Sequence, residues 1–437
     1  MKITIIGTGY VGLVSGACFS EFGHEVICID KDKDKISKLQ SGTVPIYEPG
    51  LENIVQKNAL EQRLKFDTDA SKAVPWADTI FIAVGTPSSR RGDGYADLSF
   101  IYDAAREIAP LLTGYTLIVN KSTSPVGTAR QVARIIRETN QDAHFDIASN
   151  PEFLREGAAI NDFMKPDRVV IGVETERAAD VLKDVYKPLY LIETPIVQAD
   201  IETAELIKYA ANAFLAVKIS YINEMATLCE NVGADVIKLA KAIGLDNRIG
   251  SKFLHPGPGY GGSCFPKDTL ALLRMAQENG SAVRIVEAAI EVNAAQKARM
   301  IRKIRDAVGG NEAGKIIGVL GLTFKPETDD MRDAPSLTIL PALFEKGAKI
   351  KVHDPQGMKE ARRYLPSGVI YMENPYQVCE GADVLVLMTE WNQYRALDLK
   401  KIKSLMRGTV FVDLRNVYEP GEMKTLGFAY FGVGRSG

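Results

Sequence analysis

A catalytic thiol is the first chemistry that this sequence suggests. Residues 257–268 read GPGYGGSCFPKD and place Cys264 among four glycines and two prolines. Glycines lack side chains and let a ligand approach the backbone closely, while a nearby lysine such as Lys267 favours the reactive thiolate. Asp268 can orient a base or a water molecule. The pattern predicts a nucleophilic role for Cys264.

The other four cysteines have different surroundings. Each lies in an apolar, periodic segment, where a free cysteine packs as a small hydrophobic residue: Cys18, Cys28, Cys229 and Cys379. An odd number of widely spaced cysteines without a CxxC pair indicates neither a disulfide framework nor a zinc site. With only four histidines in the chain, we expect no bound metal.

Two further segments carry polar groups at spacings that suit catalysis. Lys208 and Asn212 are four positions apart in helix-forming sequence, so they share a helix face and can donate hydrogen bonds to an oxyanion. Glu152 and Glu156 follow an expected strand end, where a catalytic acid or base would lie. Simpler explanations stay open: Lys208 and Asn212 can lie in solvent, and the glutamates can favour a helix N-terminus.

A dinucleotide fingerprint opens the chain. Residues 7–12 read GTGYVG, directly after a short apolar strand and before a helical stretch. Gly7 makes the tight turn, Gly9 lets a pyrophosphate approach the backbone, and Gly12 permits close helix–strand packing. The helix N-terminus offers unpaired N–H groups to phosphate. Its first turn contributes Tyr10 and Val11 to the expected cofactor contacts.

Asp30, at the end of the next strand, distinguishes between the two nicotinamide cofactors. Its carboxylate can accept hydrogen bonds from both ribose hydroxyls of NAD and would repel the 2′-phosphate of NADP, so we expect NAD. Lys31, Lys33 and Lys35 argue for NADP unless they form a solvated helix start, and Lys35 is included among the expected cofactor contacts. A thiol together with NAD suggests that hydride transfer gives an aldehyde, the thiolate traps it, and a second hydride transfer leaves a thioester for hydrolysis.

Strands alternate with helical segments in the first part of the chain, which predicts a doubly wound α/β domain. The expected strands are 2–6, 25–30, 79–84, 116–120 and 145–149. Ligands of open α/β sheets lie at the carboxyl ends of the strands. The loops at 83–87 and 120–127 should therefore border the nicotinamide and the substrate, and they supply Gly85, Thr86, Ser122 and Thr123.

An uninterrupted helical pattern without glycine or proline runs from about 200 to 231. We interpret it as a spine between domains and as an oligomer surface. Helical sequence continues to about Ala307, and a second α/β set then has expected strands at 315–322, 348–354, 383–389 and 409–414. The predicted fold class is α/β, with two Rossmann-like doubly wound domains (1–199 and 311–437) joined by a long central helix and a helical middle domain (200–310).

Composition sets limits on the function. A chain of 437 residues, 46% hydrophobic and 25% charged, suits a globular protein of two or three domains. A net charge of -2 gives no reason to expect a nucleic-acid or acidic-membrane partner. The sequence has no run of about 18 uncharged apolar residues, and its N-terminus matches a first strand better than a signal peptide. We expect a cytoplasmic protein without a membrane span.

Taken together, these motifs resemble the UDP-glucose/GDP-mannose dehydrogenase family along nearly the whole chain. Their joint order is far more specific than any one of them: GTGYVG (7–12), PIYEPGL (45–51), VGTP (84–87), KSTSPVG (121–127), NPEFLREG (150–157), ELIKYAANAFLA (205–216), the thiol loop, GLTFKPETDDMRD (321–333) and DLRN (413–416). The wording of NPEFLREGAAI and GYGGSCFPKD is most similar to the UDP-glucose branch. Other branches act on GDP-mannose or on UDP-acetylhexosaminuronic precursors.

The resemblance implies a four-electron oxidation of UDP-glucose by two NAD and water to UDP-glucuronate. It assigns the nucleophile to Cys264, the donors to the substrate oxygen to Lys208 and Asn212, and the positioning of water or a proton to Asp268. It also places Thr123 near the reacting carbon and links Glu152 to thioester hydrolysis. Implied cofactor contacts are Glu156, Lys267 and Arg332; implied substrate contacts are Glu152, Phe153, Leu154, Lys208, Asn212, Phe253, Gly261, Lys325 and Arg415.

The family also implies a homodimer in which Arg248 reaches the substrate of the neighbouring subunit, and residues 311–437 become a UDP-sugar-binding domain and 1–199 an NAD-binding domain. Two positions depart from the family pattern: Ser124 stands where a valine is usual, and DLRN replaces the common DGRN beside Arg415.

Two other hypotheses stay open, a nucleotide-sugar or NAD sensor without chemistry and a two-electron hydroxyacid dehydrogenase. The sensor has no use for the thiol and lysine, and the two-electron enzyme has no use for a nucleophilic Cys264.

Overall fold

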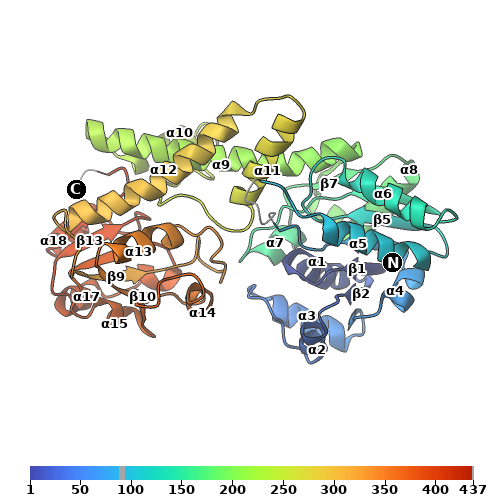
Figure 1. Cartoon of the computed structure of the whole chain (residues 1–437), viewed down its shortest axis with the longest axis horizontal. Coiled ribbons are helices and arrows are strands. Elements are labelled where there is room, and N and C mark those ends of the chain that lie inside the picture. Colours follow the sequence, from blue (N-terminus) through green and yellow to red (C-terminus); the bar gives the residue numbers. More distant parts are fainter. Residues whose placement is uncertain (88–93, 436–437) are drawn as a thin grey trace. The chain divides into compact units, whose positions relative to one another are not determined.

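The computed structural model describes residues 1–87 and 94–435, and the chain divides into two compact units (Figure 1). The first unit comprises Met1–Ala211 and Arg274–Gly280, and the second comprises Asn212–Leu273 and Ser281–Gly437. The long helix α9 (Ile201–Val232) contributes residues to both. The three domains expected at 1–199, 200–310 and 311–437 stay a prediction.

The first unit is built on an eight-stranded sheet in the order β3-β2-β1-β4-β5-β6-β7-β8. Apart from the antiparallel β6–β7 pair, the neighbouring strands are parallel. The order reverses between β1 and β4, so the carboxyl ends of these two strands form the switch point where ligands of such sheets bind. The strands are β1 (Lys2–Ile6), β2 (Glu25–Ile29), β3 (Leu64–Asp67), β4 (Thr79–Ile82), β5 (Thr116–Asn120), β6 (Phe145–Ser149), β7 (Val169–Gly172) and β8 (Ile196–Ala199).

Helices cover both faces of this sheet because alternate strand residues point to opposite sides. Ile5 packs in a buried cluster with α1, α3, α7 and α8, whereas its neighbour Ile6 packs with α4, α5 and α6. The helices are α1 (Tyr10–Glu21), α2 (Lys33–Gln40), α3 (Leu51–Leu60), α4 (Ala70–Trp76), α5 (Ser99–Ile108), α6 (Thr128–Thr139), α7 (Ala159–Met164) and α8 (Glu176–Val185), with short 3-10 turns η1 (Ala109–Leu111) and η2 (Lys187–Ile192).

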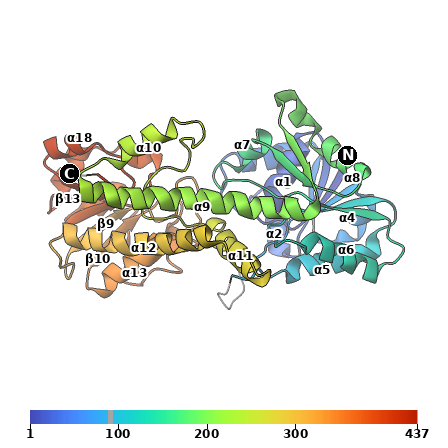
Figure 2. The ribbon, with the colours of Figure 1, turned by 90° about the horizontal axis from the view of Figure 1, so that it is seen from above.

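Within the second unit, the C-terminal part of α9 and helix α12 (Arg284–Ala307) run side by side in the same direction (Figure 2). The Ser220 hydroxyl donates to the Ala289 carbonyl at 2.9 Å, and ten residues further along both helices Glu230 forms an ion pair with Arg299. Helix α10 (Val236–Gly244) also belongs to the second unit, and α11 (Phe265–Glu278) contributes residues to both units.

A six-stranded parallel sheet in the order β11-β10-β9-β12-β13-β14 completes the second unit. The strands are β9 (Ile316–Leu320), β10 (Lys349–His353), β11 (Ile370–Tyr371), β12 (Val384–Leu387), β13 (Val410–Asp413) and β14 (Ala429–Phe431). The helices are α13 (Ser336–Glu345), α14 (Met358–Ala361), α15 (Pro375–Cys379), α16 (Asn392–Arg395), α17 (Leu399–Leu405) and α18 (Pro420–Thr425).

The structure confirms the predicted α/β class, and its central strands and the long helix agree with the expected ranges within a few residues. The sequence pattern missed the strands β3, β7, β8, β11 and β14. β11 and β14 are only two and three residues long, and β3 and β8 carry polar residues, so none of these gives a sustained apolar run. Among the described residues, no helix is long and apolar enough to cross a membrane.

Candidate active site

Each of the three fingerprint glycines is explained by a different structural requirement. Gly7 has φ +101°, a conformation that side chains disfavour. A Cβ on Gly12 would lie 2.0 Å from the Gly7 carbonyl oxygen, so only glycine lets α1 begin this close to β1. A Cβ on Gly9, the N-cap of α1, would meet no described atom within 4 Å. The space above Gly9 at the helix N-terminus suits a pyrophosphate.

Asp30 is held at the edge of this space by neighbouring donors. Its carboxylate accepts hydrogen bonds from the Thr8 amide at 2.9 Å and hydroxyl at 2.6 Å, and pairs with Lys35 Nζ at 3.0 Å. Burial alone would raise the pKa of Asp30, but the donors Thr8, Lys35 and the Asp32 amide lower it below its usual value. Asp30 therefore stays ionised, as recognition of ribose hydroxyls requires, and Lys35 lies beside it as its ion-pair partner.

The loops after β4 and β5 meet beside the fingerprint, as predicted for the carboxyl edge of the sheet. The Thr86 hydroxyl donates to the Thr123 carbonyl at 2.7 Å, and the Ser122 hydroxyl donates to the Val84 carbonyl at 2.8 Å. A Cβ on Gly85 would meet no described atom within 4 Å, so this loop also has room for a ligand. Ser124, where the family usually has valine, is buried and accepts a hydrogen bond from Asn120 at 2.8 Å.

A buried ion pair connects the end of β6 with helix α9. Lys208 Nζ lies 2.9 Å from Glu152 Oε1, and both side chains are at most 5% exposed. Burial would raise the pKa of Glu152, but the charge and hydrogen bond of Lys208, the Leu154 amide and the charge of Lys121 lower it. Glu152 is therefore a carboxylate in a dry site, with one oxygen held by an ammonium and the other by an amide.

Lys121 is a buried cation that the sequence interpretation missed. Its Nζ donates to Asn150 Oδ1 at 3.0 Å and lies 3.3 Å from the hydroxyl of Tyr186, which itself donates to Asn150 at 2.6 Å. Burial lowers the pKa of Lys121 to about 8, while the charge of Glu152 raises it and that of Lys208 lowers it. The signal was present in the motif KSTSPVG, whose lysine follows a fully buried strand.

Glu205, one helical turn before Lys208, was also missed. Its carboxylate accepts hydrogen bonds from the amides of Gly127 at 2.7 Å and Ala129 at 2.9 Å, at the start of α6. Burial raises the pKa of Glu205 to about 7, partly offset by these two amides. Glu205 therefore fixes the loop that carries Ser122 and Thr123 to helix α9.

Glu48 explains why the motif PIYEPGL accompanies the fingerprint. Its buried carboxylate accepts hydrogen bonds from the Tyr10 hydroxyl, from the Gly157 amide at 2.6 Å and from the Ala159 amide at 2.8 Å. The fingerprint helix, the motif loop and the loop after β6 are thereby joined. Burial and the negative charges of Glu48 and Glu156 raise the pKa of Tyr10, so the predicted contacts Tyr10 and Glu156 lie close together.

The predicted substrate contact Phe153 lies between two cations. The Arg168 guanidinium stacks 3.7 Å from the centre of its ring, and Lys208 Nζ lies 5.5 Å from it. Such contacts fix the orientation of an aromatic ring. Phe153 and Leu154 are only partly buried, so their loop keeps surface for a ligand.

In the second unit, the thiol precedes helix α11. The Cys264 carbonyl accepts the first helical hydrogen bond, from the Asp268 amide at 2.8 Å, and the helix dipole favours negative charge at this end. Of the five cysteines Cys264 is the one that is not buried, and its sulfur lies 3.4 Å from the Ser263 hydroxyl. The prediction that the other four belong to the core is confirmed.

One turn into α11, the buried Asp268 joins two other predicted site residues. Its oxygens accept from Asn212 Nδ2 at 2.6 Å and from Lys267 Nζ at 2.8 Å. Lys267 was predicted as a cofactor contact, and in the structure it forms an ion pair with Asp268.

The segment before the thiol is held in an unusual backbone shape. Phe253 has φ +66°, which is rare for a residue with a side chain and is typical of functional sites. Its ring packs edge to face on Phe265, which in turn contacts Tyr260. A Cβ on Gly261 would lie 2.4 Å from the Asp333 carbonyl oxygen. Gly261 is therefore required for packing against the loop that follows β9.

The Arg415 guanidinium is held by two backbone carbonyls and one carboxylate. Its guanidinium donates to the carbonyls of Met388 at 2.9 Å and Phe324 at 2.8 Å and pairs with Glu390. It thus joins three loops at the carboxyl edge of the second sheet. Lys325 follows Phe324 in one of these loops, with its Nζ 5.6 Å from the Phe324 ring.

Arg248 lies on the surface of the second unit. Its side chain is 89% exposed and pairs with Asp246 two positions earlier. The expected contact of Arg248 with the substrate of a neighbouring subunit stays a prediction.

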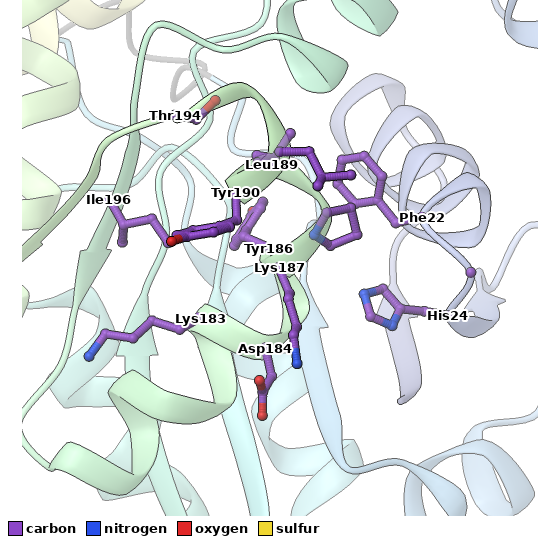
Figure 3. A pocket seen from close by; sticks show the side chains of 13 residues that line it. Phe22, His24, Lys183, Asp184, Tyr186, Lys187, Leu189, Tyr190, Thr194 and Ile196 are labelled. Carbon is purple, nitrogen blue, oxygen red and sulfur yellow. The ribbon is translucent and has the colours of Figure 1, made fainter.

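A cavity of about 940 Å³ in the first unit lies away from the fingerprint. Phe22 and His24 line one side, and Lys187, Leu189 and Tyr190 line the other (Figure 3). Phe22 and His24 follow the end of α1 and precede β2, so the cavity opens at the amino edge of the sheet, opposite the edge where ligands of such sheets bind.

Three models of one protein family match the chain. Residues 1–190 match the NAD binding domain of the UDP-glucose/GDP-mannose dehydrogenase family, residues 202–295 its central domain and residues 318–420 its UDP binding domain. These matches cover most of the length of the chain.

Individual relatives are similar over their full length. The chain is 56% identical over 437 residues to UDP-glucose 6-dehydrogenase of Rhizobium meliloti (strain 1021), covering 100% of both. It is 47% identical to UDP-glucose 6-dehydrogenase TuaD of Bacillus subtilis (strain 168), covering 99% of this chain and 93% of TuaD. The solved structure of a UDP-glucose dehydrogenase from the hyperthermophilic archaeon Pyrobaculum islandicum aligns with TM-score 0.91 and 40% identity, covering 99% of this chain and 98% of that one.

Alanine substitutions at two fingerprint glycines should separate folding from cofactor binding. Gly12→Ala forces a Cβ against the Gly7 carbonyl oxygen, so the free energy of unfolding should fall by about 1–3 kcal/mol in urea titrations. Gly9 has φ −69°, and a Cβ added there would meet no described atom, so Gly9→Ala should keep the stability of the chain. The added methyl group would occupy the space proposed for the pyrophosphate, so the NAD affinity should fall. An unchanged NAD dissociation constant in Gly9→Ala, measured by calorimetry, would contradict this assignment.

Glu205 should make stability depend on pH near neutrality. Its pKa in the folded chain is about 7, whereas an unfolded glutamate titrates near ~4.3. The folded chain binds the extra proton between these values, so the free energy of unfolding should fall as pH rises through about 7. Glu205→Gln should flatten this dependence in urea titrations. Glu202→Gln removes only a smaller contribution to the raised pKa of Glu205 and should keep most of the dependence. Equal slopes in both variants would refute the role of Glu205.

Proposed function

Because this chain belongs to the UDP-glucose/GDP-mannose dehydrogenase family, we propose that it oxidises the terminal alcohol of UDP-glucose to the carboxylate of UDP-glucuronate. The chain is an NAD-dependent oxidoreductase. The two relatives named above are UDP-glucose 6-dehydrogenases, at 56% and 47% identity, and this supports UDP-glucose over the other sugar nucleotides of the family.

The first unit fits NAD. The open space at Gly9, the N-terminus of α1 and the ionised Asp30 suit a pyrophosphate and a ribose without a 2′-phosphate. NAD, when bound, supplies the acceptor for the hydrides that leave the substrate. The residues proposed to hold it are Gly7, Gly9, Tyr10, Val11, Gly12, Asp30, Lys35, Gly85, Thr86, Ser122, Thr123, Glu156, Lys267 and Arg332.

The proposed reaction joins two oxidations by one covalent intermediate. First, a hydride leaves the alcohol carbon as the hydroxyl proton departs, and an aldehyde forms. The Cys264 sulfur adds to the aldehyde carbon as the aldehyde oxygen takes up a proton, which gives a thiohemiacetal. The thiohemiacetal becomes a thioester when a second hydride leaves the carbon and the proton leaves its hydroxyl. Water then adds to the thioester carbon, the C–S bond breaks, the thiol is restored and the carboxylate is released.

Other side chains would stabilise charge and move protons. Lys208 and Asn212, one turn apart on α9, would donate hydrogen bonds to the substrate oxygen as it gains negative charge. Glu152, kept as a carboxylate by Lys208, would accept a proton from the attacking water. Asp268 would position water or a proton, and Thr123 would lie near the reacting carbon. Further substrate contacts are proposed for Phe153, Leu154, Arg248, Phe253, Gly261, Lys325 and Arg415.

The observation that carries this proposal is the placement of Cys264. It is the one cysteine outside the buried core and it lies at the start of a helix, with Asp268 in the first turn. A thiol at a helix N-terminus is suited to act as a nucleophile. A reaction that stops at the aldehyde has no use for it.

We also propose a homodimer formed through α9. Its surface presents a stripe of large apolar side chains seven residues apart, which are Phe214, Tyr221 and Leu228 at 65%, 47% and 51% exposure. A contiguous exposed apolar stripe at this spacing marks a helix-packing surface. The cytoplasm is the proposed location, because all five cysteines are free thiols, as is usual in a reducing compartment.

The stoichiometry of NADH tests the proposed reaction directly. The purified chain should produce two NADH per UDP-glucose consumed, followed by absorbance and by quantifying the nucleotide sugar. UDP-N-acetylmannosamine and GDP-mannose, assayed in parallel, should give much slower turnover. A ratio of one NADH, or faster turnover of another sugar nucleotide, would sink the proposal.

Cys264→Ser should block hydrolytic completion while the protein stays folded. The serine oxygen cannot form the thioester, so the rate of UDP-glucuronate formation should drop by at least about 1,000-fold. Cys229→Ser is the matched control, since Cys229 is a buried core residue in the same unit, and it should keep turnover. Full activity in Cys264→Ser would remove the thioester mechanism.

Subunit mixing tests whether Arg248 acts across the dimer. Arg248→Ala and Cys264→Ser should each be nearly inactive alone. If Arg248 serves the neighbouring subunit, a mixture refolded in equal parts should recover about a quarter of normal activity, since half of the dimers hold one intact site of two. If Arg248 serves its own subunit, the mixture should stay inactive.

A further inference from the structure

We propose that Asp330 is a positioning residue that couples the cofactor side of the site to the nucleophilic thiol. Asp330 lies in the loop after β9, within the motif GLTFKPETDDMRD, and no role for it follows from the reaction described above. The proposal rests on two parts of the proposed function, that Arg332 contacts NAD and that Cys264 is the nucleophile.

The Asp330 carboxylate makes two sets of contacts within the second unit. Oδ1 accepts from the Arg332 amide at 2.9 Å and from its Nε at 2.8 Å, while Oδ2 accepts from Arg332 Nη2 at 3.0 Å. Oδ2 also accepts from the Ser263 amide at 3.2 Å. One buried carboxylate thus holds the guanidinium of one loop and the backbone of the other.

The contact with Ser263 reaches the thiol directly. Ser263 immediately precedes Cys264, and its hydroxyl lies 3.4 Å from the sulfur. The Gly262 amide donates to the Arg332 carbonyl at 2.8 Å, and Gly261 lies against the Asp333 carbonyl with no room for a Cβ. The backbone that aims the thiol is therefore built on the loop that carries Arg332.

The proposed coupling works through this shared carboxylate. The Arg332 side chain is 60% exposed, so its guanidinium can turn toward an anionic ligand such as a cofactor phosphate. Asp330 then gives up part of its pairing with Arg332, and its hydrogen bond to the Ser263 amide strengthens, because an unshared carboxylate is the better acceptor. Cofactor binding would thereby tighten the thiol loop before the nucleophile is needed.

Site-specific alkylation tests this coupling without any sugar nucleotide. Iodoacetamide modification of Cys264 is followed by mass spectrometry of the Cys264 peptide, with and without saturating NAD. We expect NAD to change the alkylation rate of the unsubstituted chain several-fold, and Asp330→Asn to remove most of that change. Asp329→Asn, which removes a neighbouring carboxylate, should leave the NAD effect intact, and Asp330→Glu should restore part of it.

Two outcomes would overturn the proposal. An NAD effect of equal size in Asp330→Asn and the unsubstituted chain would show that Asp330 transmits nothing, as would an equal loss in Asp329→Asn. If Asp330→Asn unfolds, Arg332→Gln tests the same link from the exposed side and should also abolish the NAD effect on alkylation. If the alkylation experiment contradicts the role of Asp330 while the turnover assay still gives two NADH per UDP-glucose, the proposed function stands and only the coupling is refuted.

Discussion

The first unit depends on a buried ion pair between Lys208 and Glu152. Two ions in a dry interior are stable only when both are paired and their remaining hydrogen-bonding capacity is used. Glu152 meets this condition through Lys208 on one oxygen and the Leu154 amide on the other. Removing either partner would leave an uncompensated charge at a cost of about 3–5 kcal/mol. The pair therefore fixes the loop after β6 to helix α9, and with it the position of every side chain on that loop.

Buried carboxylates hold three other parts of the site in the same way. Glu205 receives the two free amides at the start of α6, and Glu48 receives those at the start of α7. In the second unit, Asp268 satisfies Asn212 and Lys267. Each is a buried carboxylate that satisfies donors otherwise left unpaired. Loops held in this way keep their shape without a ligand, which lowers the entropy cost of binding one.

Sequence patterns predicted the parts of the molecule that are governed by local rules. Periodicity located the central strands and α9, and the turn at Gly7 and the close packing at Gly12 agree with the structure, while the pyrophosphate contact of Gly9 stays a prediction. Lys121 and Glu205 were not predicted because their importance lies in partners about 30 and 80 positions away in the chain. Local propensity carries no record of such pairings. The thiol loop was singled out by its glycines, but the reason for Gly261, the Asp333 carbonyl pressed against it, depends on a distant loop.

The two sheets show how one fold can keep or lose a dinucleotide site. Asp30 follows β2 with its carboxylate at the ligand space, bound by Thr8 and Lys35. Asp354 has the same place after β10, but its carboxylate is fully buried and accepts from the Leu322 and Gly357 amides at 2.7 Å and from the Trp391 indole. The Asp354 carboxylate therefore has no exposed surface for a ribose, whereas the Asp30 side chain keeps 16% of its surface exposed. The second sheet lies in the region that matches a UDP binding domain. The two sheets differ in the burial of one carboxylate, since both share the same strand arrangement around their first strand.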